Sequence, residues 1–129
     1  MALGVATAVR NTKMGKMADA VDAGAGAGLL RLYDGTRPIT GGSVTNLLVE
    51  LTFSTTSFGS PSSGAIAANA IAAVLSSLSG TATWFRIVDS ANTFVCDGEV
   101  GTDLVLNNAV IASGVLVEIT SVVLTDGDS

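Results

Sequence analysis

The sequence contains no histidine and a single cysteine, Cys96, among its 129 residues. Histidine is the commonest general base and the commonest metal ligand, and a thiolate zinc site needs several cysteines. The composition therefore excludes a hydrolytic triad of the ordinary kind, and we expect neither a metal nor a cofactor. Cys96 has no second cysteine to pair with and lies in an apolar run, which is typical of a small buried hydrophobic residue.

Charged residues are also scarce, at 13% of the chain, and eleven acidic residues face six basic ones. The net charge of −5 repels phosphate and anionic lipid, so we expect no nucleic-acid partner and no membrane-surface partner. The charge is uneven, with a net of +2 over residues 1–37 and a net of −7 over residues 38–129. This asymmetry favours head-to-tail contact between copies, although so few charges also produce it by chance.

The sequence gives little support for secretion or membrane insertion. No basic segment precedes the first apolar stretch, and Arg10 interrupts that stretch, so we expect a protein made and kept in a cytoplasm. The longest uncharged segment, 51–85, is broken by serine and glycine. Its most apolar part, 65–78, is shorter than the ~20 apolar residues of a spanning helix. A holin-like membrane protein is the minor alternative.

The N-terminal residues 5–22 predict one amphipathic helix, because apolar side chains recur there at steps of three and four. The run GAGAG at 24–28 stops the helix and has the backbone freedom of a hinge or a flexible link. We therefore divide the chain into an N-terminal helix or arm with a Gly-Ala hinge at 1–28 and a β-sandwich domain at 29–129. The helix is expected either to pack on its own domain or to reach a neighbouring subunit.

After the hinge the apolar period changes from three and four to two, which is typical of strands. The runs TATWFRIVD and TFVCDGEV are separated by Ser90, Ala91 and Asn92, a spacing that suits a hairpin. About six to eight such runs with Gly/Ser turns follow one another. This arrangement predicts a mainly β fold, with a β-sandwich or jelly-roll-like domain after an N-terminal helix or arm.

Three segments give more specific expectations. In LLVELTF, alternation places Val49 and Leu51 on one face and Leu48 on the other. Residues 115–125 alternate over eleven positions and are apolar on both faces, so this strand is expected to be central, or to be covered on its outer side by another element or another subunit. Residues 65–78 are ambiguous, with a strand expected near Ala65–Ile71 and a short helix or loop beyond.

Paired carboxylates are the catalytic arrangement that the composition leaves open. Glu50 and Glu118 fall on expected strands and could approach each other as in a glycosidase, but few aromatic residues are present to bind a sugar. A solvent-facing role is therefore favoured for both glutamates. Asp126 and Asp128 could help to hold Ca²⁺, although acids on a free end are more often solvated.

The remaining cation, Arg86, shares an expected strand with Trp84. We expect it to pair across the hairpin with Asp97 or Glu99, in preference to a neighbouring subunit.

Three segments together resemble a family of small virion proteins of tailed bacteriophages. They are YDGTRP at Tyr33–Pro38, the Leu-rich strand after Gly41 and Gly42, and the TATWFRI strand with its acidic hairpin. The resemblance runs from about Val5 to the end, and the Ala-rich stretch 65–78 departs from the family pattern. It implies a structural protein without catalytic motifs.

Within that family the resemblance implies a capsid cement or decoration protein, a homotrimer bound to the major capsid protein on the capsid surface and assembled in the host cytoplasm. The alternative is a tail or fibre component that attaches to the host, and a carboxylate-based hydrolase is third. Contact residues are expected on the arm, on the two-faced strand and at two arginines: Val9, Met14, Met17, Val21, Arg31, Arg37, Leu116, Val122 and Leu124.

Overall fold

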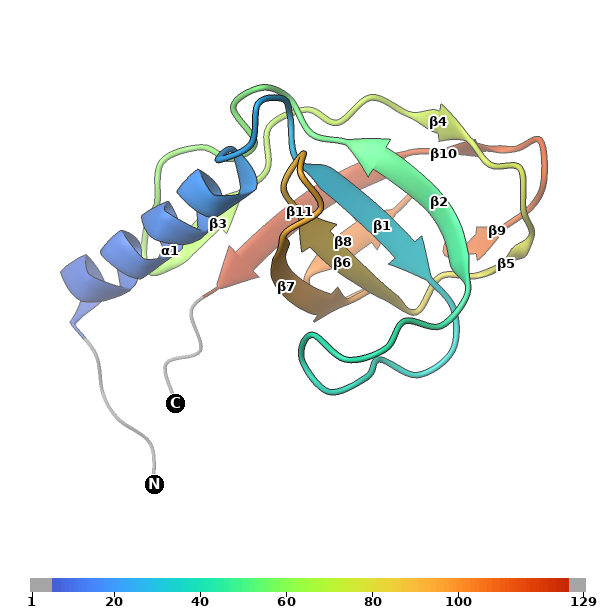
Figure 1. Cartoon of the computed structure of the whole chain (residues 1–129), viewed down its shortest axis with the longest axis horizontal. Coiled ribbons are helices and arrows are strands. Elements are labelled where there is room, and N and C mark those ends of the chain that lie inside the picture. The colour runs from blue at the N-terminus through green and yellow to red at the C-terminus, as the bar shows by residue number, and fades with distance from the viewer. Residues whose placement is uncertain (1–5, 126–129) are drawn as a thin grey trace.

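The computed structural model describes residues 6–125, and it is mainly β with one N-terminal helix (Figure 1). The prediction of a β-rich, sandwich-like domain preceded by a helix is confirmed. The elements are α1 Thr7–Val21, β1 Leu29–Tyr33, β2 Leu47–Thr52, β3 Ala65–Ala67, β4 Val74–Leu75, β5 Gly80–Thr81, β6 Trp84–Val88, β7 Phe94–Glu99, β8 Leu104–Leu106, β9 Val110–Ile111, β10 Leu116–Val117 and β11 Ile119–Thr125. The strands outnumber the expected runs because β4, β5, β9 and β10 have two residues each, too few to show alternation.

Two layers of antiparallel strands enclose the core. The larger sheet has the order β2-β1-β6-β7, and the other strands form the sheets β3-β11-β8, β10-β4 and β5-β9. In Figure 1, β11 crosses behind β1 and β2. One apolar cluster joins the layers, since it holds Leu30 and Ile87 of the larger sheet and Ile66, Leu104 and Val117 of the smaller ones.

The helix α1 packs against its own domain. Met14 and Val21 are buried and belong to the same core as the strands, and α1 lies against β3 and β7. The segment after the helix is docked rather than free, because the Gly26 N–H donates to Ser90 Oγ at 3.0 Å in the turn between β6 and β7. A Cβ on Gly28 would lie 2.8 Å from the Val21 carbonyl oxygen. The Gly-Ala run is therefore closely packed in this structure, and its role as a hinge stays a prediction.

In β2 and in β11 an extra residue shifts the register of strand pairing, so the simple alternation of faces expected from the sequence does not hold there. β1 pairs Leu32 with Val49 and Tyr33 with Leu47, so Leu48 is an extra residue and is buried beside Val49. β11 pairs Ile119 with Leu106 and Ser121 with Val105, so Thr120 is extra. A bulge of this kind turns the following side chains to the opposite face. Val117 and Val122 are five residues apart and would lie on opposite faces of a regular strand. Because the bulge lies between them, both are buried.

The Ala-rich segment forms short strands rather than a helix. β3 covers only Ala65–Ala67 of the expected strand, and the chain then runs as a loop to β4. Between residues 6 and 125, the structure contains no helix with the length and apolar character needed to cross a membrane.

Candidate contact site

The loop of residues 34–46 joins β1 to β2 and projects below the sheet in Figure 1. Its tip carries Ile39, whose side chain is 90% exposed, and Val44 is also exposed. Gly41 has φ = 76°, and the Gly42 N–H donates to the Ile39 carbonyl at 2.6 Å. A tight turn therefore fixes the tip, because only a residue tolerant of the left-handed region fits at Gly41.

The base of the loop is closed by hydrogen bonds around Trp84. The buried indole N–H of Trp84 donates to the Asp34 carbonyl and to Thr45 Oγ1, each at 3.0 Å. Thr45 Oγ1 donates to the same carbonyl. The Asp34 carboxylate accepts from the Asn46 backbone N–H at 3.0 Å and from its side-chain amide at 3.2 Å. The Trp84 ring stacks on Tyr33 with centroids 4.4 Å apart.

A buried ion pair holds the middle of the loop. Arg86 donates from Nε to Asp97 Oδ1 at 2.6 Å and from Nη2 to Asp97 Oδ2 at 3.0 Å. Nη2 also donates to the Gly42 carbonyl at 2.9 Å, and Asp97 Oδ2 accepts from the Gly41 N–H at 3.0 Å. The expected pairing of Arg86 across the hairpin is confirmed, with Asp97 as the partner.

The aromatic residues of the same hairpin cover this pair. The Arg86 guanidinium lies 5.4 Å from the Trp84 ring centroid and 5.1 Å from that of Phe94, within cation–π range. Hydrogen bonding to Asp97 raises the pKa of Arg86 more than its burial lowers it. The guanidinium is therefore a permanently charged support for the loop.

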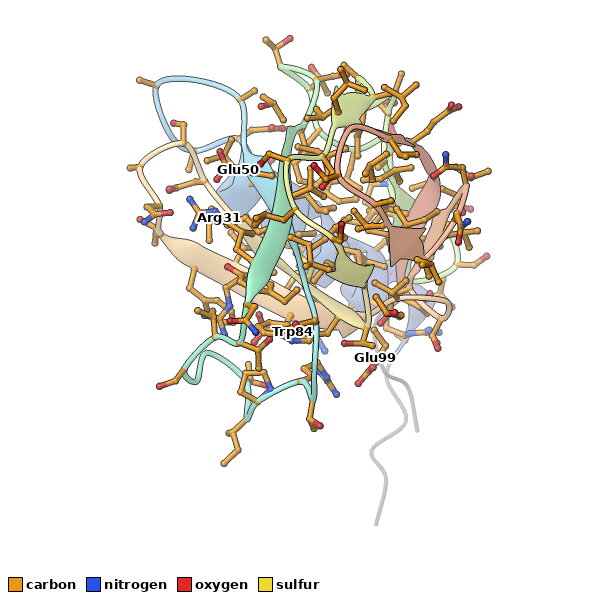
Figure 2. All side chains as sticks on the ribbon, turned by 90° about the vertical axis from the view of Figure 1, so that its right-hand side faces the viewer. Arg31, Glu50, Trp84 and Glu99 are labelled. Atoms are coloured by element: carbon orange, nitrogen blue, oxygen red, sulfur yellow. The ribbon has the colours of Figure 1, made fainter. Side chains whose placement is uncertain are left out.

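A third contact braces the side of the loop. Arg37 Nε donates to Glu99 Oε1 at 2.9 Å, and Thr83 Oγ1 donates to the Gly35 carbonyl at 2.5 Å. In Figure 2, Trp84 and Glu99 lie near the end of the domain from which the loop projects, and Arg31 and Glu50 lie farther along the sheet. The loop is thus tied to β6 and β7 at its base, middle and side.

A second exposed apolar surface lies on β4 and β10, away from the 34–46 loop. Leu75 of β4 and Leu116 of β10 are direct cross-strand partners and are 65% and 45% exposed. Val115 is exposed next to Leu116, and its carbonyl accepts from the Ser76 N–H at 3.1 Å. We call Leu75, Val115 and Leu116 the end patch. In Figure 1 its strands lie at the upper right, away from the 34–46 loop.

The structure separates the predicted contact residues into buried and exposed sets. Met14, Val21, Val122 and Leu124 are buried in the chain's own core, so they offer no contact surface and those four assignments are corrected. Their apolar character serves packing within the chain.

The exposed set is small. Val9 on α1 and Leu116 in the end patch are exposed, and Met17 is partly buried against the core. Arg31 is ion-paired with Glu50 at 2.7 Å, and Arg37 with Glu99.

The most exposed large apolar side chain of residues 6–125, Ile39, is absent from the contact residues predicted from the sequence. Ile39 lies outside every periodic run, and alternation says nothing about a loop. The available signal was an apolar side chain between Pro38 and the Gly41-Gly42 turn, where polar residues are usual.

The two glutamates that were candidates for a carboxylate pair lie in different segments. Glu50 lies on the edge strand β2 and pairs with Arg31, whereas Glu118 lies between β10 and β11. Asp126 and Asp128 lie outside the described residues. Over residues 6–125 no three Cys, Asp or Glu side chains gather in a metal-binding cluster.

Cys96 is half-buried beside a cavity of about 160 Å³ that Met14, Met17 and Leu124 also line. Burial, aided by the charges of Asp97 and Asp103, raises the pKa of its thiol to about 12. The thiol is therefore protonated near neutral pH and is a poor nucleophile.

No protein-family model, curated protein or solved structure matches this chain. Two of the segments from which a resemblance to phage virion proteins was expected, Tyr33–Pro38 and the hairpin of β6 and β7, are joined by hydrogen bonds at the base and side of the 34–46 loop. The third, the Leu-rich strand after Gly41 and Gly42, follows this loop as β2.

Proposed function

We propose that the chain is a non-enzymatic structural protein of a tailed-bacteriophage virion. More specifically, we propose a capsid cement or decoration protein that forms a homotrimer, binds the major capsid protein and stabilises the head. The observation that carries the proposal is the braced 34–46 loop with Ile39 at its tip. A buried ion pair and an indole hydrogen bond hold an apolar side chain in solvent, and covering that side chain with a partner would lower the free energy.

The position of the two exposed surfaces supports a bridging role. The loop tip and the end patch lie at different ends of the domain (Figure 1), so one copy can touch two neighbours at once. Cement proteins act by multivalent contact, in which weak contacts add because each holds the next at high local concentration. We assign the end patch to the capsid lattice.

The charge pattern fits the same role. Arg31, Arg37 and Arg86 each pair with an acid of this chain. The end patch contains no charged residue. Contact there depends on apolar burial, which salt does not screen.

Binding to shells tests the proposal. Shells of the encoding virus, assembled without this protein, are mixed with the purified chain and sedimented. We expect the native chain to cosediment. Leu75→Ser and Leu116→Ser each weaken binding at least about tenfold, because each removes a leucine side chain that becomes buried when the chain binds the shell. Val105→Ser on β8 alters an apolar residue outside the patch that is as exposed as Leu116, and it serves as the matched control.

Two outcomes overturn the proposal. One is a native chain that stays in the supernatant at all shell concentrations. The other is immunogold labelling of complete virions that decorates the tail or fibres, which selects the tail alternative.

A further inference from the structure

We infer that copies of this chain bind one another by inserting Ile39 of one copy into a cavity beside Leu47 and Leu78 of the next. This inference rests on the proposed contact function and names the partner, a second copy of the same chain. Ile39 is the most exposed large apolar side chain in residues 6–125.

The receiving cavity has a volume of about 430 Å³ and lies between the base of the 34–46 loop and the segment that follows β4. Its lining residues are Asp34, Thr45, Asn46, Leu47, Leu48, Leu78 and Ser79. Leu47 and Leu78 are 40% and 51% exposed, so the cavity has an apolar wall open to solvent. An apolar cavity of about 150 Å³ accepts a benzene molecule. This cavity is larger and is lined by both polar and apolar residues, so it has room for an isoleucine side chain.

Charge complementarity selects a second copy as the occupant. Arg37 lies two residues before Ile39, and its side chain is 37% exposed although Nε binds Glu99. Guanidinium has five N–H donors, so donors remain for a further acceptor. In the cavity wall, Asp34 supplies a carboxylate whose oxygens also retain acceptor capacity beyond Asn46. One chain thus carries a cation beside the inserting side chain and an anion beside the receiving cavity.

The same network fixes both halves of this contact. Asp34, Thr45 and Asn46 close the base of the loop that presents Ile39, and they also form one wall of the cavity. Both surfaces are therefore held in shape before association, which lowers the entropy lost on binding. The two surfaces differ, so the contact is heterologous, and such contacts close into rings when the rotation allows. A homotrimer is the ring that the proposed function requires.

Complementation between two variants tests the inference. In Ile39→Ser the inserting side chain is lost and the cavity stays intact, whereas in Leu78→Trp the cavity is filled and Ile39 is retained. Sedimentation velocity is measured for the native chain, for each variant and for their equimolar mixture. We expect the native chain to self-associate and each variant alone to do so at least about tenfold more weakly. The mixture forms a 1:1 complex, because the intact Ile39 of the Leu78→Trp chain enters the intact cavity of the Ile39→Ser chain.

Val44→Ser is the matched control, since Val44 is exposed on the same loop but does not line the cavity. It is expected to associate like the native chain. A native chain that stays monomeric, an Ile39→Ser chain that associates normally, or a mixture without a complex overturns the inference. The shell-binding experiment is independent of these outcomes. A self-associating chain that binds no shell refutes the cement role alone. A monomer that binds shells refutes the contact between Ile39 and the cavity, and the homotrimer with it, but leaves the cement role standing.

Discussion

Arg86 and Asp97 face each other across β6 and β7, and each also binds a different glycine of the 34–46 loop. The guanidinium donates to the Gly42 carbonyl at 2.9 Å, and the carboxylate accepts from the Gly41 N–H at 3.0 Å. One ion pair therefore connects two strands to the turn that presents Ile39. Because the Asp97 side chain is fully buried, the two charges depend on each other for compensation.

Replacing one member of this pair is expected to be costly. Asp97→Asn leaves the Arg86 charge without its counter-ion and lowers the free energy of unfolding by about 3–5 kcal/mol. Glu99→Gln, which breaks the exposed pair with Arg37, costs less than about 1 kcal/mol. Urea unfolding measures both, with amide exchange at Gly41 as a second readout. Equal losses in the two variants would contradict the structural role of Asp97.

The two glycines of the Gly-Ala run that lie nearest β1 are expected to respond differently to alanine. A Cβ at Gly28 meets the Val21 side chain and its carbonyl oxygen at 2.8 Å, whereas at Gly26 the nearest atom lies 3.7 Å away. Gly28→Ala therefore lowers the free energy of unfolding by about 1–3 kcal/mol through overpacking, and Gly26→Ala changes it little. Thermal unfolding compares them. A flexible hinge would instead make both variants slightly more stable, because alanine restricts the unfolded chain.

Stability is expected to fall at alkaline pH because of Cys96. The folded thiol has a pKa of about 12, against an ordinary value near 9. Below pH 9 both states hold the proton, so the thiol adds no pH dependence there. Between about pH 9 and 12 only the unfolded state ionises, and the free energy of unfolding falls by up to about 1.4 kcal/mol per pH unit.

Comparison with Cys96→Ala isolates this contribution, since other groups titrate in the same range. The native-minus-variant difference in unfolding free energy is measured from pH 7 to pH 11. It should be constant up to about pH 9 and decline above it. A difference that stays flat to pH 11 would mean that the folded thiol ionises normally.

Thr45 is expected to control the position of the loop base. Thr45→Val keeps the shape of the side chain but removes the acceptor of the Trp84 indole and the donor to Asp34. The Trp84 N–H keeps its bond to the Asp34 carbonyl, so the cost is about 1 kcal/mol. Trp84 is the only tryptophan, and its emission should shift to longer wavelength as the base loosens. Thr52→Val on the exposed side of β2 is the control, and an identical spectrum in both variants would rule out this role.

Much of the β fold could be predicted because the strongest signals are local. The hairpin of β6 and β7 follows from two alternating runs with a short turn, and opposite charges at Arg86 and Asp97 lie across it. The bulges at Leu48 and Thr120 could not be predicted, because an extra residue is defined by the register of the partner strand.

The candidate site was harder to predict than the fold. Met14, Val21, Val122 and Leu124 have the same apolar character whether they pack within the chain or against another chain. Only the three-dimensional arrangement assigns them to the chain's own core. Ile39 is exposed but was not predicted as a contact residue, because its loop has no hydrophobic periodicity from which exposure can be inferred.

The docked segment after α1 also favours packing of the helix on its own domain over packing on a neighbouring copy. Seven residues, 22–28, join the end of α1 to the start of β1. Such a short tether holds α1 beside its own domain at an effective concentration in the millimolar range. A neighbour would compete for the helix only at a similar concentration, and exchange would also break the Gly28–Val21 packing and the Gly26–Ser90 hydrogen bond. The association proposed between copies of this chain would therefore leave each copy with its own helix.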